Sequence, residues 1–148
     1  MRIKDIASLR GGAGLLCLLL LAACSDPGNT TKVAQQVADG YYQALKNKDF
    51  PKAAGYFMDT KAVPRAQWLD ELRDYHDKLG DLQSFKLVGQ QVNTVYSGTR
   101  YTLHYKTQYS KFPATETLIL FDGVSTFGGG KGGNVLQIES LILRSKGL

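Results

Sequence analysis

The chain contains few of the residues that build disulfides, metal centres and redox sites. Its 148 residues include only two cysteines and two histidines, and both cysteines lie within the first 24 positions. Residues 25–148 therefore contain no thiol, which excludes a disulfide or a thiolate-bound metal in that part of the chain. His76 and His104, isolated in the sequence, make no recognisable metal set. We expect no metal and no other cofactor.

The chain also lacks a strong concentration of charge. Eighteen Lys and Arg stand against thirteen Asp and Glu, which gives a formal charge of +5. Without residues 1–23 the charge is +3, because fifteen basic and twelve acidic side chains are left. This mild excess is unlike the clustered basic stripe of a nucleic-acid-binding protein, so we expect no nucleic-acid partner. The length and a hydrophobic content of 43% are typical of one globular domain.

No apolar run is long enough to cross a bilayer. Residues Leu15–Ala23 are almost wholly apolar, but they supply about half of the residues that a membrane-spanning helix requires. They follow the short basic segment Met1–Arg10, and this order is that of a secretory signal peptide. The alternative is a buried core helix, but residues 18–21 are all leucine and leave no polar side.

The end of this apolar run, Leu21-Ala22-Ala23-Cys24, resembles the lipobox of bacterial lipoproteins. The resemblance implies that a diacylglycerol is attached to the Cys24 thiol and that the chain is cleaved between Ala23 and Cys24. It also implies acylation, for example by palmitate, of the new amino group. Two or three acyl chains hold a protein firmly on a membrane.

The lipobox resemblance predicts three segments: a signal peptide at 1–23, a flexible tether at 24–31 and a globular domain at 32–146. Cys17 would leave with the signal peptide. Ser25 follows the lipidated cysteine, where an Asp would favour the inner membrane, so we expect the outer membrane with the domain facing the periplasm. Inner and outer membrane both remain open until the protein is fractionated.

Helical spacing governs the first half of the domain. Val33, Val37, Tyr41 and Leu45 recur every four residues and predict one apolar helix face, in which Gly40 indicates close packing against another element. Three helices are predicted, at 31–48, at 51–59, and from Pro64 to a capping Gly80.

After residue 81 the apolar period changes to two, which indicates strands. Four antiparallel strands are predicted, at 85–96 with a bulge near Gly89, 99–109, 115–122 and 135–144. The stretch FGGGKGG at 127–133 lacks the Ser or Thr that follows Gly-Lys in a phosphate-binding loop, so we interpret it as a flexible loop. Segregated helices and consecutive hairpins predict the α+β class: three N-terminal helices packed on a curved four-stranded antiparallel sheet.

This order, and the stretch ADGYYQALKNKDFPKAAGYF at 38–57, resembles the nuclear-transport-factor-2-like (cystatin-like) cone fold. The resemblance implies a pocket between sheet and helices. Enzymes of that superfamily, such as the ketosteroid isomerase-like members, use Asp, His and Tyr there as acids or bases. The corresponding candidates in this chain are Tyr41, Tyr101, His104, Tyr105, Glu116 and Asp122.

The catalytic set would be His104, Tyr105 and Asp122. The pocket would be lined by Tyr41, Tyr101, Leu103 and Tyr105. An imidazole can act as an acid or a base near neutral pH, but His104 shares a strand face with Arg100 and Lys106, which is typical of a solvated histidine. The tyrosines could line a pocket or simply fill the core.

A cationic patch is the remaining feature. Lys86, Arg100, Lys106 and Lys111 are predicted on the strand face away from the core, where they would attract anionic headgroups or cell-wall polymers, or merely keep the protein soluble.

We therefore favour a non-enzymatic, lipid-anchored envelope protein that binds a partner protein or a small apolar ligand. The alternative is a periplasmic acid–base enzyme of the ketosteroid isomerase-like type. A pocket with a desolvated carboxylate beside tyrosine hydroxyls would support the enzyme, and a cone filled by side chains would argue against it.

Overall fold

The computed structural model describes residues 27–123 and 136–148. The expected signal peptide, Cys17, Cys24 and the glycine-rich segment at 127–133 lie outside the described residues. Within them, three helices precede four strands: α1 (Pro27–Lys46), α2 (Phe50–Ala54), α3 (Arg65–Leu79), β1 (Leu82–Val95), β2 (Gly98–Tyr109), β3 (Pro113–Gly123) and β4 (Gln137–Ser145).

Helix α1 is longer at its start than the sequence suggested. It begins at Pro27, within the segment 24–31 that was expected to be a flexible tether. Proline suits the first turn of a helix, because its fixed φ is already helical and its missing N–H would have no partner there. Further along, a Cβ atom at Gly40 would meet the Tyr56 hydroxyl, which confirms that this glycine marks a close contact.

Helix α2 is shorter than predicted. It ends at Ala54, and the chain then extends along β4: the Met58 N–H donates to Ile138 O (2.9 Å) and the Ile138 N–H donates to Tyr56 O (2.9 Å). The prediction of a helix over 51–59 was wrong at its end, because the backbone finds hydrogen bonds on the edge of the sheet. This pairing also covers part of an edge strand.

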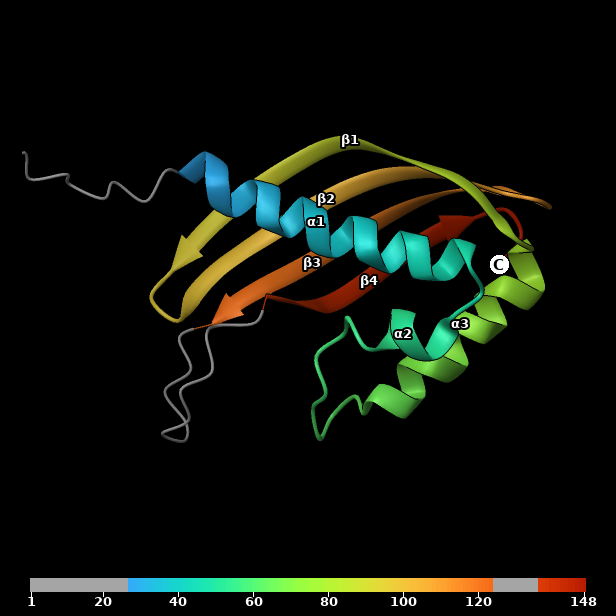
Figure 1. Ribbon diagram of the computed structural model, residues 1–148, viewed down its shortest axis with the longest axis horizontal. Coiled ribbons are helices and arrows are strands. Elements are labelled where there is room, and N and C mark those ends of the chain that lie inside the picture. The colour runs from blue at the N-terminus through green and yellow to red at the C-terminus, as the bar shows by residue number, and fades with distance from the viewer. Residues whose placement is uncertain (1–26, 124–135) are drawn as a thin grey trace, which may run out of the picture.

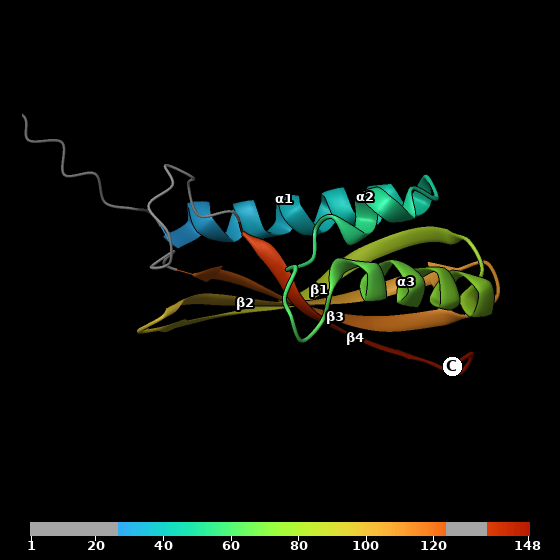
Figure 2. The ribbon, with the colours of Figure 1, turned by 90° about the horizontal axis from the view of Figure 1, so that it is seen from below.

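The four strands form one antiparallel sheet in the order β1-β2-β3-β4 (Figure 1). The register shifts between Leu87 and Gly89, which confirms the predicted bulge, and again between Ile119 and Leu120. All three helices lie on one side of the sheet (Figure 2). The fold is therefore α+β, as predicted.

The core lies between the helices and this face of the sheet. The Tyr42 ring stacks on Phe85 with centroids 4.6 Å apart, and the Phe57 ring stacks on Trp68 at 4.2 Å. None of the three described helices lies on the outer face of the sheet (Figure 2).

Removing Phe57 tests this aromatic core. Because Phe57 is fully buried between Trp68 and Tyr41, we expect Phe57→Ala to lower the free energy of unfolding by about 3–5 kcal/mol in urea denaturation. The matched control is Phe112→Ala, at an exposed ring, which should change it by less than about 1 kcal/mol. Similar losses in the two variants would contradict the packing described.

Candidate functional site

Glu116 is the one carboxyl group within the described core. It lies on β3, faces the helices and is 1% exposed. Its Oε1 accepts hydrogen bonds from the Tyr109 and Thr107 hydroxyls, both at 2.8 Å, and its Oε2 accepts one from the Tyr42 hydroxyl at 3.2 Å. The neighbouring strand β2 and helix α1 thus converge on this group.

Burial has the largest effect on the pKa values of this cluster. Desolvation raises the pKa of Glu116 above its ordinary value of 4.5, although the three hydroxyl donors oppose the rise. Desolvation and the charge of Glu116 raise the pKa values of Tyr42 and Tyr109, so both phenols stay protonated as donors. No described Lys, Arg or His forms an ion pair with Glu116.

The space beside the cluster is filled by side chains. A cavity of about 10 Å³ lies among Tyr41, Leu72, Tyr75, His76 and Tyr109, and this volume is near the lower limit for one water molecule. A desolvated carboxyl group beside tyrosine hydroxyls is therefore present, but this cavity is too small for an organic substrate.

His76 closes one side of this cavity. Its Nε2 lies 2.7 Å from Oδ1 of Asp81, and Lys48 Nζ lies 2.9 Å from Oδ2 of the same carboxylate. Hydrogen bonds from Lys48 and then His76 lower the pKa of Asp81. The His76 ring is half-buried against Phe50. Among residues 27–123 and 136–148, no group of His, Cys, Asp and Glu side chains could hold a metal ion.

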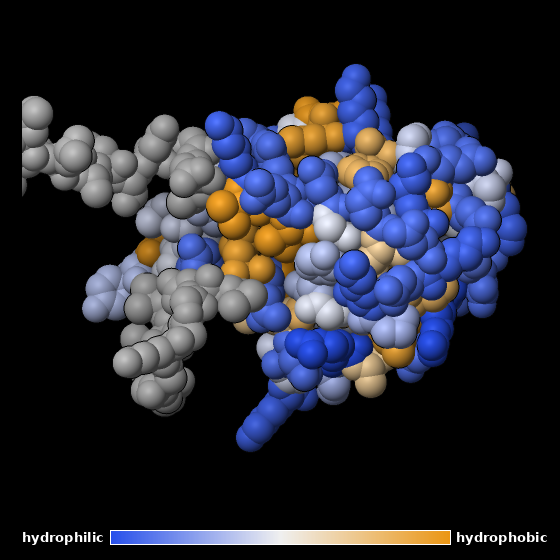
Figure 3. Space-filling view, viewed as in Figure 1, coloured by the Kyte–Doolittle hydropathy of each residue, from blue (hydrophilic) through white to orange (hydrophobic). Residues whose placement is uncertain are grey.

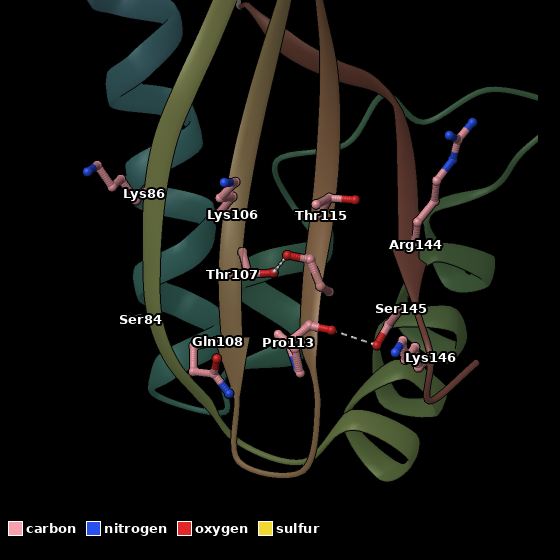
Figure 4. Close-up of a pocket in the computed structure, with 11 residues that line it drawn as sticks. Ser84, Lys86, Lys106, Thr107, Gln108, Pro113, Thr115, Arg144, Ser145 and Lys146 are labelled. Carbon is pink, nitrogen blue, oxygen red and sulfur yellow. Dashed lines mark hydrogen bonds between the residues drawn. The ribbon is translucent and has the colours of Figure 1, made fainter.

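The larger concavity lies on the opposite face of the sheet. A groove of about 680 Å³ crosses all four strands there, and we call it the cationic groove. Figure 4 looks onto this face with the helices behind the sheet. The groove is lined by Ser84, Lys86, Lys106, Thr107, Gln108, Pro113, Ala114, Thr115, Arg144, Ser145 and Lys146.

The cationic groove has four basic side chains and no acidic one among its described lining residues. None of the four, Lys86, Lys106, Arg144 and Lys146, forms an ion pair with another described residue. A second hollow of about 450 Å³ adjoins it and shares Lys106 and Arg144. Like charges gathered without partners favour an anionic ligand.

The predicted cationic patch is divided by the structure. Lys86 and Lys106 lie opposite each other on β1 and β2 and line the groove. Arg100 instead donates to both carboxylate oxygens of Glu139 at 2.9 and 3.0 Å, with its guanidinium over the Phe121 ring. Lys111 donates to the Asp77 carbonyl oxygen. Arg144 and Lys146 were missed, because only the register of β4 brings them beside the two lysines.

The comparisons with known proteins bear on the fold. No protein-family model matches the chain, and no curated protein matches its sequence. It is similar in structure to a protein of unknown function from Silicibacter pomeroyi that is described as NTF-2-like, with a TM-score of 0.53, 13% identity and coverage of 82% of this chain and 99% of that one. The fold is nuclear-transport-factor-2-like.

Two other solved structures share this nuclear-transport-factor-2-like arrangement. A protein from Catenulispora acidiphila gives a TM-score of 0.54 at 15% identity, covering 80% of this chain and 92% of that one. A longer protein from Bdellovibrio bacteriovorus gives 0.50 at 11% identity, covering 76% of this chain but only 39% of that one. At such identities the likeness concerns the fold alone.

Within the nuclear-transport-factor-2-like fold, the predicted pocket residues Tyr41, Tyr101, Leu103 and Tyr105 are all buried on the core face. Tyr41 lines the interior cavity of about 10 Å³. Burial, and then the charge of Asp39, raises the pKa of Tyr105. That shift keeps the phenol protonated and makes it a poor base.

The three predicted catalytic residues are not brought together. His104 points to the outer face, where Nδ1 lies 3.0 Å from the Thr117 hydroxyl, whereas Tyr105 points into the core. Asp122 lies near the far end of β3, opposite Thr99, and its Oδ1 is buried without a hydrogen-bond partner in the described part of the chain. The strand alternation already separates positions 104 and 105.

Replacing the buried carboxyl group tests its protonation. Because the pKa of Glu116 is raised on folding, the folded state binds the proton more tightly than the unfolded chain. The contribution of Glu116 to the free energy of unfolding should therefore be fully present below about pH 4.5. It should decline as the pH rises through the pKa of Glu116 in the folded state. We expect Glu116→Gln to flatten this decline in urea denaturation between pH 4.5 and 8.

The matched control for that pH series is Glu139→Gln. Arg100 lowers the pKa of Glu139. The contribution of this carboxylate to the free energy of unfolding is therefore lost as the pH falls, and it causes no decline at higher pH. Parallel pH profiles for the wild type and Glu116→Gln would disprove a raised pKa at Glu116.

Proposed function

We propose that this nuclear-transport-factor-2-like protein is a lipid-anchored, non-enzymatic binding module of a bacterial envelope, and that its cationic groove takes an acidic segment of a partner protein. The observation that carries the proposal is the contrast between the two faces of the sheet. The interior cavity has a volume of about 10 Å³, whereas the groove on the outer face has a volume of about 680 Å³. Four basic side chains line this groove, and none forms an ion pair with another described residue.

The groove has the dimensions and chemistry of a peptide site. Its volume lies within the range of about 300–1,000 Å³ that is usual for ligand sites, although it is open along the sheet. The hydroxyl and amide groups of Ser84, Thr115 and Gln108 also line the groove and can hydrogen-bond a carboxylate or a peptide backbone. A small apolar ligand, the other ligand considered from the sequence, fits such a surface less well.

The acid–base alternative is supported by one observation, the contact of Glu116 with the Tyr42 and Tyr109 hydroxyls. It requires a substrate to reach that carboxyl group, and the cavity beside Tyr41 and Tyr109 has a volume of only about 10 Å³. The groove therefore supports binding better than the interior supports catalysis.

The lipid anchor is supported by the lipobox resemblance at Leu21–Cys24 and by the position of α1. The helix begins at Pro27, so only Ser25 and Asp26 separate it from Cys24 in the sequence. Among the described residues, no helix is long and apolar enough to cross a membrane.

The two cysteines provide a matched pair for testing the anchor. We expect Cys24→Ser to abolish acylation, because its hydroxyl cannot accept the thioether-linked lipid, and to move the protein from the membrane to the soluble fraction. Cys17→Ser should leave both properties unchanged. The mass of the mature N-terminal peptide and sucrose-gradient fractionation measure the two, and the gradient also tests the outer-membrane location. Membrane association that survives Cys24→Ser would refute the anchor.

Binding at the groove is tested with a fluorescent oligo-glutamate peptide. We expect Lys106→Ala and Arg144→Ala each to weaken its affinity by about fivefold at low salt, since each removes one well-placed charge, and the wild-type affinity to fall as salt screens the groove. The control is Lys46→Ala, at an exposed lysine on α1 outside the groove. Fluorescence anisotropy without binding, or with an equal loss for Lys46→Ala, would rule out the groove as the site.

A further inference from the structure

Four of the exposed apolar side chains in the described part of the chain lie at one end of the molecule. Val33 on α1 is 43% exposed, Val92 and Val95 on β1 are 51% and 38% exposed, and Tyr96 at the turn between β1 and β2 is fully exposed. We call these four residues the hairpin-tip surface. Figure 3 shows apolar side chains exposed at this end of the molecule.

The packing of α1 brings the hairpin-tip surface together. The Tyr42 ring stacks on Phe85, and the Gln35 side-chain amide donates to Gln90 at 2.7 Å, so α1 runs antiparallel to β1. Further towards residue 27, the helix approaches the last residues of β1 and the turn that follows. Figure 1 shows the start of α1 and this hairpin at the same end of the sheet.

The cationic groove lies at the other end. It is lined by Lys86 near the start of β1 and by Lys146 just after β4. From Lys86 to Val95 the strand extends over a distance of about 30 Å at its usual rise. The hairpin-tip surface beside the start of α1 and the cationic groove thus lie towards opposite ends of the sheet.

We infer that the hairpin-tip surface contacts the interfacial region of the bilayer that holds the N-terminal lipid, which turns the cationic groove away from the membrane. This inference rests on the proposed anchor at Cys24. Three residues of chain, 24–26, precede α1 and can span at most about 11 Å. A lipid on residue 24 therefore keeps this end of the domain, and no other end, next to the headgroups.

The chemistry of the hairpin-tip surface suits a membrane interface. Tyrosine is enriched there because its ring is apolar and its hydroxyl reaches water and headgroups. Residues 92–99 contain no charged side chain, so insertion of the turn desolvates no ion. Exposed Lys32, on the same turn of α1 as Val33, can face anionic headgroups.

The orientation can be measured on the mature lipidated protein in vesicles of phosphatidylethanolamine and phosphatidylglycerol. Tyr96→Cys and Lys111→Cys introduce a thiol at the β1–β2 and β2–β3 turns, at opposite ends of the sheet. No competing thiol exists in the anchored protein, since Cys17 is removed and Cys24 is acylated. Each thiol is labelled with the fluorophore NBD, and nitroxide-bearing lipids serve as quenchers.

We expect the label at position 96 to be quenched at least threefold more than the label at position 111. Equal quenching of two variants that both float with the vesicles would overturn the orientation and leave the anchor intact. Failure to float, together with an unacylated N-terminal peptide, would overturn the anchor and the orientation that rests on it. Because both positions are exposed turns, folding of the variants can be confirmed by circular dichroism.

Discussion

The position of Tyr42 determines how the helical layer lies on the sheet. Its ring stacks on Phe85 of β1 and tilts against Tyr105 of β2, while its hydroxyl reaches Glu116 on β3. One side chain of α1 thus contacts three strands, by apolar packing at the ring and by a hydrogen bond at its tip. Because both contacts need the helix at the same height and angle, they fix α1 across the sheet and leave little space beneath it.

This filling has a functional consequence. Tyrosine and phenylalanine rings pack around the Glu116 cluster in the interior, whereas the large groove lies on the outer face of the sheet. There the side chains of β1, β2 and β4 place cations with no acidic neighbour in the groove. The same alternation that directs Thr107 towards Glu116 directs Lys106 to the opposite side. The alternation of side chains along β2 therefore contributes both to the core and to the cationic groove.

The sequence predicted much of this architecture, because the apolar periods of 3.6 and 2 are local properties. Tyr101, Leu103 and Tyr105 were correctly placed on one face of β2, and the register confirmed a bulge before Gly89. Long-range pairings were not predictable. Arg144 joins the groove only because β4 pairs with β3 in one register, and Tyr56 to Met58 leave their helix because β4 offers hydrogen bonds from a distant part of the chain. Glu116 stood among the candidates, but its donors were not identified, because their convergence depends on the β2–β3 turn and on α1.

The bridge between Phe57 and Ile138 affects the order in which the protein can fold. These two residues are separated by more than half of the chain, and contacts between distant residues slow folding because a long loop must first be closed. The segment after α2 can reach its final path only after the last strand has been synthesised and has joined the sheet. Until then Phe57 lacks part of its cover, and a nascent chain exposes this ring to chaperones and proteases.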